Sequence, residues 1–162
     1  MTAAADATAA TAATAGDGCP LCGRRAAAEH QLVWQDDRLH VVRVDEPGQP
    51  CFFRVVWNAH VAETSDLDPA GRAALWRVLL ALETAIRRAV EPAKMNLASL
   101  GNQVPHLHWH VIGRWPDDPH FPASVWSAPV RAVEPDRHRT RRRAVDAALP
   151  SIRDALSRDA AG

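Results

Sequence analysis

Residues 106–111 read His-Leu-His-Trp-His-Val, a strict alternation of histidine with apolar side chains. Successive side chains of a β-strand point to opposite faces, so this pattern predicts a strand with one apolar and one polar face. His106, His108 and His110 then share one face, about 7 Å apart from one to the next. The apolar residues between them are expected to face a hydrophobic core.

A row of three imidazoles gathers groups that act near neutral pH as nucleophiles, acids or metal ligands. The residues alone leave three interpretations open. The row is a nucleophilic site, a metal centre in which His-x-His clamps zinc or iron, or three surface histidines on an exposed strand. The regular alternation after a glycine-containing turn favours a functional site.

The rest of the chain predicts a five-stranded sheet and one long helix. Apolar runs within residues 31–57 are separated by turn residues and predict three antiparallel strands. Residues 68–90 repeat Leu, Val and Ile at spacings of three and four and predict a long amphipathic helix. Residues 95–100 and the histidine segment supply two further strands. The order β-β-β-α-β-β predicts an α+β domain, mainly antiparallel, with the helix packed on the sheet.

The chain of 162 residues is long enough for one domain with tails. We expect residues 1–16, rich in Ala and Thr, to form a disordered tail and residues 17–130 to form the domain. Residues 131–162, rich in Arg and Ala, are expected to form a peripheral extension of short helices broken at Pro150. The arginine cluster at 137–143 is interpreted as a solvated helix face.

Basic and acidic residues are equal in number, 19 of each, so the chain has no overall field to attract nucleic acid or an anionic membrane. No run of about 18 apolar residues predicts a membrane span. We therefore expect neither nucleic acid nor membrane as a partner. An odd count of three cysteines favours a reducing compartment, and the cytoplasm is the expected location.

Cys19 and Cys22 are separated by two residues, a spacing that lets two thiolates bind one tetrahedral zinc ion. A redox pair and two inert thiols remain the alternatives. The spacing alone does not decide among them.

The run from Pro105 to Ile112, Pro-His-Leu-His-Trp-His-Val-Ile, resembles the signature of the histidine triad (HIT) family of nucleotide hydrolases and transferases. The long helix and the segment Trp-Asn-Ala-His ending at His60 fall in the family's order, so the resemblance spans about residues 19–126. It implies a HIT-like fold and a nucleotide or nucleoside phosphoramidate-like small molecule as ligand. It also implies a homodimer paired through the long helix and the adjoining strand.

The resemblance implies that His108, the middle histidine, attacks the α-phosphorus of a nucleotide and forms a nucleotidyl-histidine intermediate. Water or another acceptor then resolves it, and the chemistry needs no metal. A neutral imidazole is a good nucleophile, and covalent catalysis divides one difficult displacement into two easier ones. His110 is expected to contact the phosphate and the leaving group.

The resemblance also suggests substrate-binding residues. Asn102 and Gln103 occupy the turn that holds the phosphate, where the family commonly has Gly-Gln-Ser or Gly-Gln-Thr. Asp45 and Asn96 are candidates for contact with the ribose, and Trp126 for substrate selection. Each has an ordinary structural alternative. Asn102 and Gln103 would then be simple turn residues and Asp45 a solvated turn aspartate. Asn96 would be an ordinary strand residue and Trp126 a packing residue.

Bacterial members that resemble this chain complete a zinc site from a cysteine pair, the histidine at the end of the segment that matches Trp-Asn-Ala-His, and the first triad histidine. The corresponding residues are Cys19, Cys22, His60 and His106. The resemblance implies a structural zinc ion, because four protein ligands close its coordination. Such a clip would tie the N-terminal region to the histidine strand.

Two departures place the chain on a divergent branch. Phe52 stands where related hydrolases often have a fourth histidine, and Trp-Asn-Ala-His replaces the more usual Pro-Lys form. The leading hypothesis is a nucleotidyl hydrolase or transferase with His108 as nucleophile. A zinc-stabilised nucleotide-binding protein with little turnover and a metal-dependent hydrolase using the three histidines are the alternatives.

Overall fold

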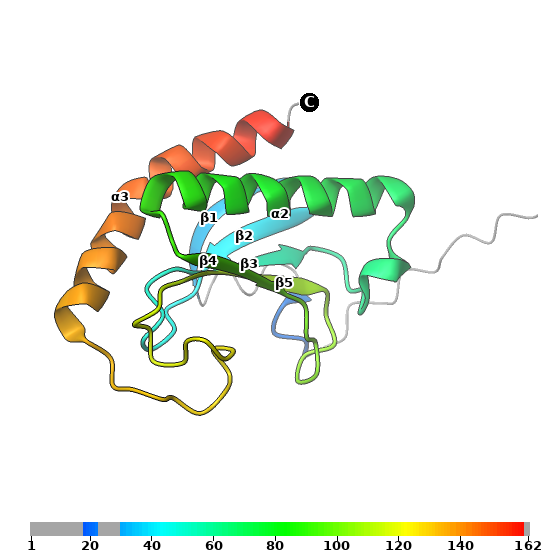
Figure 1. Ribbon diagram of the computed structural model, residues 1–162. Helices are drawn as coiled ribbons and strands as arrows, with labels where there is room; N and C mark the ends of the chain where they lie inside the picture. Colours follow the sequence, from blue (N-terminus) through cyan, green and yellow to red (C-terminus); the bar gives the residue numbers. More distant parts are fainter. Residues whose placement is uncertain (1–17, 23–29, 161–162) are drawn as a thin grey trace, which may run out of the picture.

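The computed structural model describes residues 18–22 and 30–160, so the expected tail at residues 1–16 lies outside the described residues. The chain forms an antiparallel sheet with two long helices on one side (Figure 1). The described elements, in chain order, are β1 (Gln31–Gln35), β2 (Leu39–Arg43), β3 (Phe52–Trp57), η2 (Thr64–Asp66), α2 (Pro69–Val90), β4 (Lys94–Ala98), β5 (His108–Arg114) and α3 (Pro135–Ala160).

The five strands lie in the order β1-β2-β3-β5-β4, and every neighbouring pair is antiparallel. This confirms the predicted α+β fold with a five-stranded sheet under one long helix. The histidine strand β5 pairs with β3 on one side and β4 on the other, so it lies inside the sheet. Its register places Val56 opposite His108 and Arg54 opposite His110.

Helix α2 begins where the sequence predicts. Asp68 caps it by accepting a hydrogen bond from the Gly71 amide at 2.6 Å, and Pro69 occupies the first turn, where its missing N–H costs nothing. The helix ends at Val90, and the capping residue Glu91 adopts the left-handed conformation, with φ of 45°. Its apolar stripe is fully buried against the sheet at Leu75, Leu79, Leu82 and Ile86.

The alternation in the histidine segment is confirmed, with one change of boundary. Leu107 and Val111 are buried in the core beneath the helices, and Trp109 packs at its edge. The imidazoles of His108 and His110 belong to the opposite, open face of the sheet. Strand β5 begins only at His108, so His106 lies just before the strand rather than within it.

The expectation of short peripheral helices broken at Pro150 is wrong. Residues 135–160 form one continuous helix, α3, which is bent: its C-terminal part lies along α2, and its N-terminal part turns away from α2 (Figure 1). It contributes Val145, Leu149, Ile152 and Leu156 to the main core, each at most 5 % exposed. Their spacing of three and four residues makes an apolar stripe that the abundant arginines obscured. Pro150 lies on the exposed side of α3, where water can hydrate the carbonyl that loses its backbone partner, and a bend in the helix relieves the clash of the proline ring.

No helix in the described part of the chain is long and apolar enough to cross a membrane.

Candidate active site and metal centre

A cavity of about 400 Å³ opens on the face of the sheet opposite the helices. This volume suits a small-molecule ligand. Five of the residues predicted from the sequence line it, from β5, from the turn before β5 and from the loop after it. They are His108, His110, Asn102, Gln103 and Trp126.

His108 is fixed in one tautomer by its backbone contact. Its Nδ1 lies 2.7 Å from the carbonyl oxygen of His106, and because a carbonyl only accepts hydrogen bonds, Nδ1 carries the proton. The other ring nitrogen, Nε2, then bears a free lone pair. Burial, and to a smaller extent the charge of Arg54, lowers the pKa of His108. The ring is therefore neutral near pH 7, in the form that a nucleophile needs.

His110 stands edge-on to His108, with ring centroids 4.9 Å apart, inside an aromatic enclosure. The Trp126 ring lies 5.0 Å from it and the Phe52 ring 5.5 Å, both in edge contact. Burial lowers the pKa of His110 to about 3, and the charges of His108 and Arg54 contribute. Phe52 therefore supplies an apolar wall beside the ring of His110.

The turn between β4 and β5 forms one wall of the cavity. Gly101 has a φ of 68°, a left-handed conformation that glycine adopts without strain, and it directs the chain into Asn102 and Gln103. Ser99 donates a hydrogen bond to the carbonyl oxygen of His108 at 3.1 Å and so holds the end of β4 against the start of β5. The two amides at this turn border the same space as His108.

Asp45 and Asn96 do not line this cavity. Asp45 pairs with Arg142 of α3 and borders a separate cavity of about 110 Å³, which adjoins the first through the shared residue His30. Asn96 accepts a hydrogen bond from Arg114 at 2.7 Å and borders a groove along β4. Trp126 contributes to both that groove and the main cavity.

Arg54 is a lining residue that sequence reasoning missed. It is half-buried in the middle of β3 and faces the cavity beside His110. The signal was present in the sequence, because Arg54 is the single charged residue of the run Cys-Phe-Phe-Arg-Val-Val-Trp at residues 51–57. A charge within an otherwise apolar strand is costly to bury unless it is paired or hydrogen-bonded, so its presence indicates a specific partner or ligand.

The four residues predicted as metal ligands come together beside the cavity lined by His108 and His110. The ligand atoms of Cys19, Cys22, His60 and His106 all lie within 4.8 Å of one another. Cys22 Sγ is 3.2 Å from His60 Nδ1 and 3.6 Å from His106 Nδ1, and the two Nδ1 atoms are 3.3 Å apart. Ligands of a tetrahedral zinc ion stand about 3.3–3.8 Å from one another, so the donor set fits a metal ion of this geometry.

The ring of His106 is oriented for metal binding. Its Nε2 lies 2.6 Å from the carbonyl oxygen of Trp57, so Nε2 carries the proton and Nδ1 presents its lone pair to the cysteines. Such an outer hydrogen bond commonly fixes the tautomer of a histidine that binds a metal.

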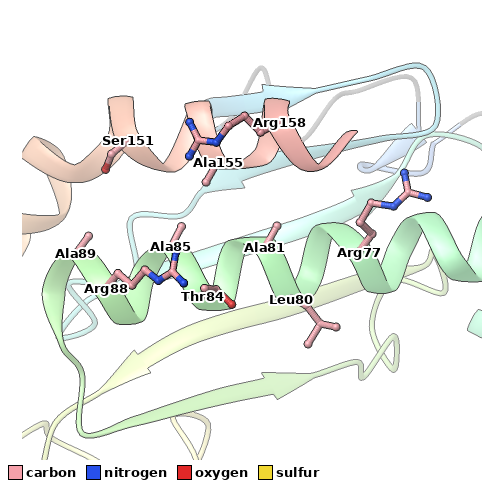
Figure 2. Close-up of a pocket in the computed structure, with 10 residues that line it drawn as sticks. All are labelled: Arg77, Leu80, Ala81, Thr84, Ala85, Arg88, Ala89, Ser151, Ala155 and Arg158. Atoms are coloured by element: carbon pink, nitrogen blue, oxygen red, sulfur yellow. The ribbon is translucent and has the colours of Figure 1, made fainter. Parts of the chain in front are cut away.

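A larger cavity lies elsewhere in the described structure. It has a volume of about 710 Å³ and lies between α2 and α3, on the helical side of the sheet. Figure 2 shows Arg77 and Arg88 on α2 and Arg158 on α3, with alanines between them. Its described lining contains no histidine, cysteine or carboxylate, so it offers no general base that could activate the hydroxyls of Thr84 and Ser151.

This fold and this row of imidazoles define an α+β protein with a histidine-lined cavity on the open face of its sheet. The model of the HIT domain matches residues 25–117, and the chain belongs to the histidine triad family. A comparison with curated protein sequences finds no match.

Solved structures of histidine triad proteins share the fold. One from Marinobacter aquaeolei VT8 is 26 % identical with a TM-score of 0.65, and covers 82 % of this chain and 94 % of its own. One from Bradyrhizobium japonicum is 23 % identical with a TM-score of 0.60, and the match covers 77 % of this chain and 94 % of that chain. A zinc-bound histidine triad family protein from Mycobacterium smegmatis is 18 % identical with a TM-score of 0.52, and the match covers 90 % of this chain and 100 % of that chain.

Proposed function

We propose that this HIT protein is a nucleotidyl hydrolase or transferase with His108 as its nucleophile. The observation that carries the proposal is the hydrogen bond from His108 Nδ1 to the His106 carbonyl oxygen, which leaves Nε2 unprotonated in a cavity of nucleotide size. A bond forms between Nε2 and the α-phosphorus while the bond from phosphorus to the leaving group breaks. The leaving group departs with the electron pair and takes up a proton. Water or another acceptor then attacks phosphorus and releases His108.

The surrounding groups have defined roles in this scheme. His110 contacts the phosphoryl oxygens or the leaving group, as its position beside His108 supports. The amides of Asn102 and Gln103 bind the phosphate, and Trp126 limits the size of the leaving group over His110. A donor aimed at developing charge typically contributes about 3–4 kcal/mol to transition-state stabilisation.

Asp45 and Asn96 remain proposed contacts of the nucleoside. For Asp45 the ligand must extend past His30 into the smaller cavity, which Arg142, the ion-pair partner of Asp45, also lines. For Asn96 it must extend past Trp126 toward β4. These contacts therefore depend on a ligand longer than the main cavity.

We propose zinc as the ion held by Cys19, Cys22, His60 and His106. Two thiolates and two imidazoles are a preferred zinc set, and four protein ligands leave no open position, so the ion has a structural role. The described cysteines are thiols outside any disulfide, which suits a reducing compartment, and we propose the cytoplasm as the location.

We further propose a two-fold homodimer that binds no nucleic acid and no membrane. Strand β4 is at the edge of the sheet, and α2 exposes Trp76 and Leu80, at 43 % and 54 %. An edge strand beside an exposed apolar helix face can continue the sheet into a second copy.

The alternative of a nucleotide-binding protein with little turnover is favoured by one observation, the apolar enclosure of His110 by Phe52 and Trp126. The metal-dependent hydrolase is disfavoured by geometry. It requires three imidazoles on one ion, whereas His106 directs Nδ1 to the cysteines and Nε2 to the Trp57 carbonyl.

Steady-state hydrolysis of an adenosine 5′-phosphoramidate, together with AMP binding, tests the proposal. Because the nucleophile is lost but the cavity remains, His108→Ala is expected to lower kcat by at least about 10³-fold and to change the Kd for AMP by less than about threefold. Wild-type protein that binds AMP but turns over no faster than His108→Ala would favour the binding-protein alternative.

A further inference from the structure

Arg54 lies on the cavity face of the sheet, directly beside the triad. It is the cross-strand partner of His110, and residues directly opposite in an antiparallel pair project to the same face with Cβ atoms about 4.5–5.5 Å apart. His108 lies one pair further along, opposite Val56. Arg54 and both histidines line the same cavity of about 400 Å³.

The guanidinium is held in position within the cavity wall. Its Nη1 lies 3.3 Å from Nε2 of His30, which borders the same space. Its charge reaches the triad, because after burial and the charge of His108 it contributes to the low pKa of His110. The side chain is only half-buried and lines the cavity.

The cavity needs such a charge if its ligand carries a phosphate. Apart from Arg54 and the histidines, the residues described as lining it are uncharged, chiefly Leu, Val, Trp and two amides. An anion that leaves water for a partly apolar cavity must be compensated by a counter-charge and hydrogen bonds. Guanidinium meets phosphate oxygens with two parallel hydrogen bonds, which makes it well suited to this role.

We propose that Arg54 binds the nonbridging oxygens of the phosphate placed against His108, so that the site selects nucleotides by charge. The inference rests on the proposed function, because it assumes that the phosphate occupies the triad cavity. As His108 attacks, negative charge on those oxygens is balanced by the neighbouring guanidinium. The cavity therefore takes nucleoside 5′-phosphates and discriminates strongly against the uncharged nucleosides.

Calorimetric titration of the full chain tests this. Each of four nucleosides and its 5′-monophosphate is titrated into wild-type protein, and the tightest pair is carried forward to Arg54→Gln, Arg54→Lys and Arg143→Gln. Arg143 is an exposed arginine of α3, so Arg143→Gln removes the same charge away from the cavity.

A hydrogen bond to a charged group is typically worth a factor of about 10–100 in affinity, so wild type is expected to bind the monophosphate at least about 10-fold more tightly than the nucleoside. Arg54→Gln is expected to lose about 10- to 100-fold for the monophosphate and less than about twofold for the nucleoside. Arg54→Lys recovers part of the loss, because it keeps the charge but not the planar fork. Arg143→Gln matches wild type.

Two results would overturn the inference. One is a wild-type protein that binds nucleoside and monophosphate equally, a measurement that needs no variant. The other is an Arg54→Gln protein that keeps the wild-type melting temperature and also the wild-type affinity for the monophosphate. Binding is measured without turnover, so an inactive protein that still shows the Arg54-dependent preference would contradict the proposed chemistry and leave this inference standing.

Discussion

His108 donates its Nδ1–H to the backbone carbonyl oxygen of His106 at 2.7 Å, while the ring of His106 turns toward Cys19 and Cys22. One residue therefore serves both centres: its side chain belongs to the metal cluster, and its carbonyl sets the tautomer of the proposed nucleophile. The ring of His106 is held further by the Trp57 carbonyl oxygen, which accepts a hydrogen bond from Nε2 at 2.6 Å, and its backbone amide donates to the Val104 carbonyl oxygen at 2.8 Å. Loss of the metal ion should therefore disturb the contact between the His106 carbonyl and His108.

Cys22→Ser is expected to lose bound zinc, to melt at a lower temperature and to lower kcat, because a hydroxyl is a poor zinc ligand and the cluster holds His106 in place. For a chain of this size each kcal/mol lost lowers Tm by about 2–4 °C. Elemental analysis, thermal unfolding and turnover measure the three effects. Cys51→Ala is the control: this buried thiol lies outside the cluster, so the variant should keep its zinc. Equal zinc contents in wild type and Cys22→Ser would contradict the assignment.

The C-terminal helix is expected to be a stability element of the domain. Ile152 is 1 % exposed within the main core, so Ile152→Ala should lower the free energy of unfolding by about 2–5 kcal/mol. Val130→Ala, in the loop before α3, removes apolar carbons from a side chain that is 62 % exposed and should cost far less. Urea unfolding with circular dichroism makes the comparison. Similar costs for the two variants would mean that α3 does not pack as described.

The buried ion pair of Arg114 and Asp118 should make the free energy of unfolding fall at acid pH. Arg114 Nε is 2.6 Å from Asp118, whose other oxygen accepts from the backbone amides of His120 and Phe121 at 2.9 and 2.7 Å. Burial acts to raise the pKa of Asp118, but these hydrogen bonds outweigh it and the pKa is lowered. The folded pKa therefore lies below the unfolded one. The stabilisation that the Asp118 carboxylate contributes is fully present above its pKa in the unfolded chain, about 3.9, and is lost as pH falls through its pKa in the folded protein.

Asp118→Asn tests that sign. Leaving Arg114 buried without its carboxylate should cost about 3–5 kcal/mol at pH 7. The cost should shrink as pH falls below 4, because protonation removes the same interaction from the wild type. Urea unfolding of both proteins between pH 3 and pH 7 gives the difference. A difference that stays constant over this range would contradict the lowered pKa.

The sequence predicts the sheet, α2 and the triad well because each has a strong local pattern. The alternation at residues 106–111 and the caps around Asp68 and Pro69 are properties of neighbouring residues, and the structure preserves them. Cys19, Cys22, His60 and His106 come from three distant segments and could be grouped only through the family resemblance.

The misses have a common physical cause, which is tertiary packing. The stripe of Val145, Leu149, Ile152 and Leu156 is hidden among arginines and becomes apparent only when α2 and the sheet are present to bury it. Arg54 reads as an irregularity in an apolar strand until the register with β5 places it beside His110.

The formation of a nucleotidyl adduct on His108 is the central claim, and intact-protein mass spectrometry tests it most directly. Wild type and His108→Ala are mixed briefly with an adenosine 5′-phosphoramidate and analysed without acid, because a phosphorus–nitrogen bond to imidazole is acid-labile. The account predicts a transient mass increase of one nucleoside monophosphate on wild type, absent from His108→Ala. Product formation by wild type with no adduct at any time, or the same adduct on His108→Ala, would contradict it.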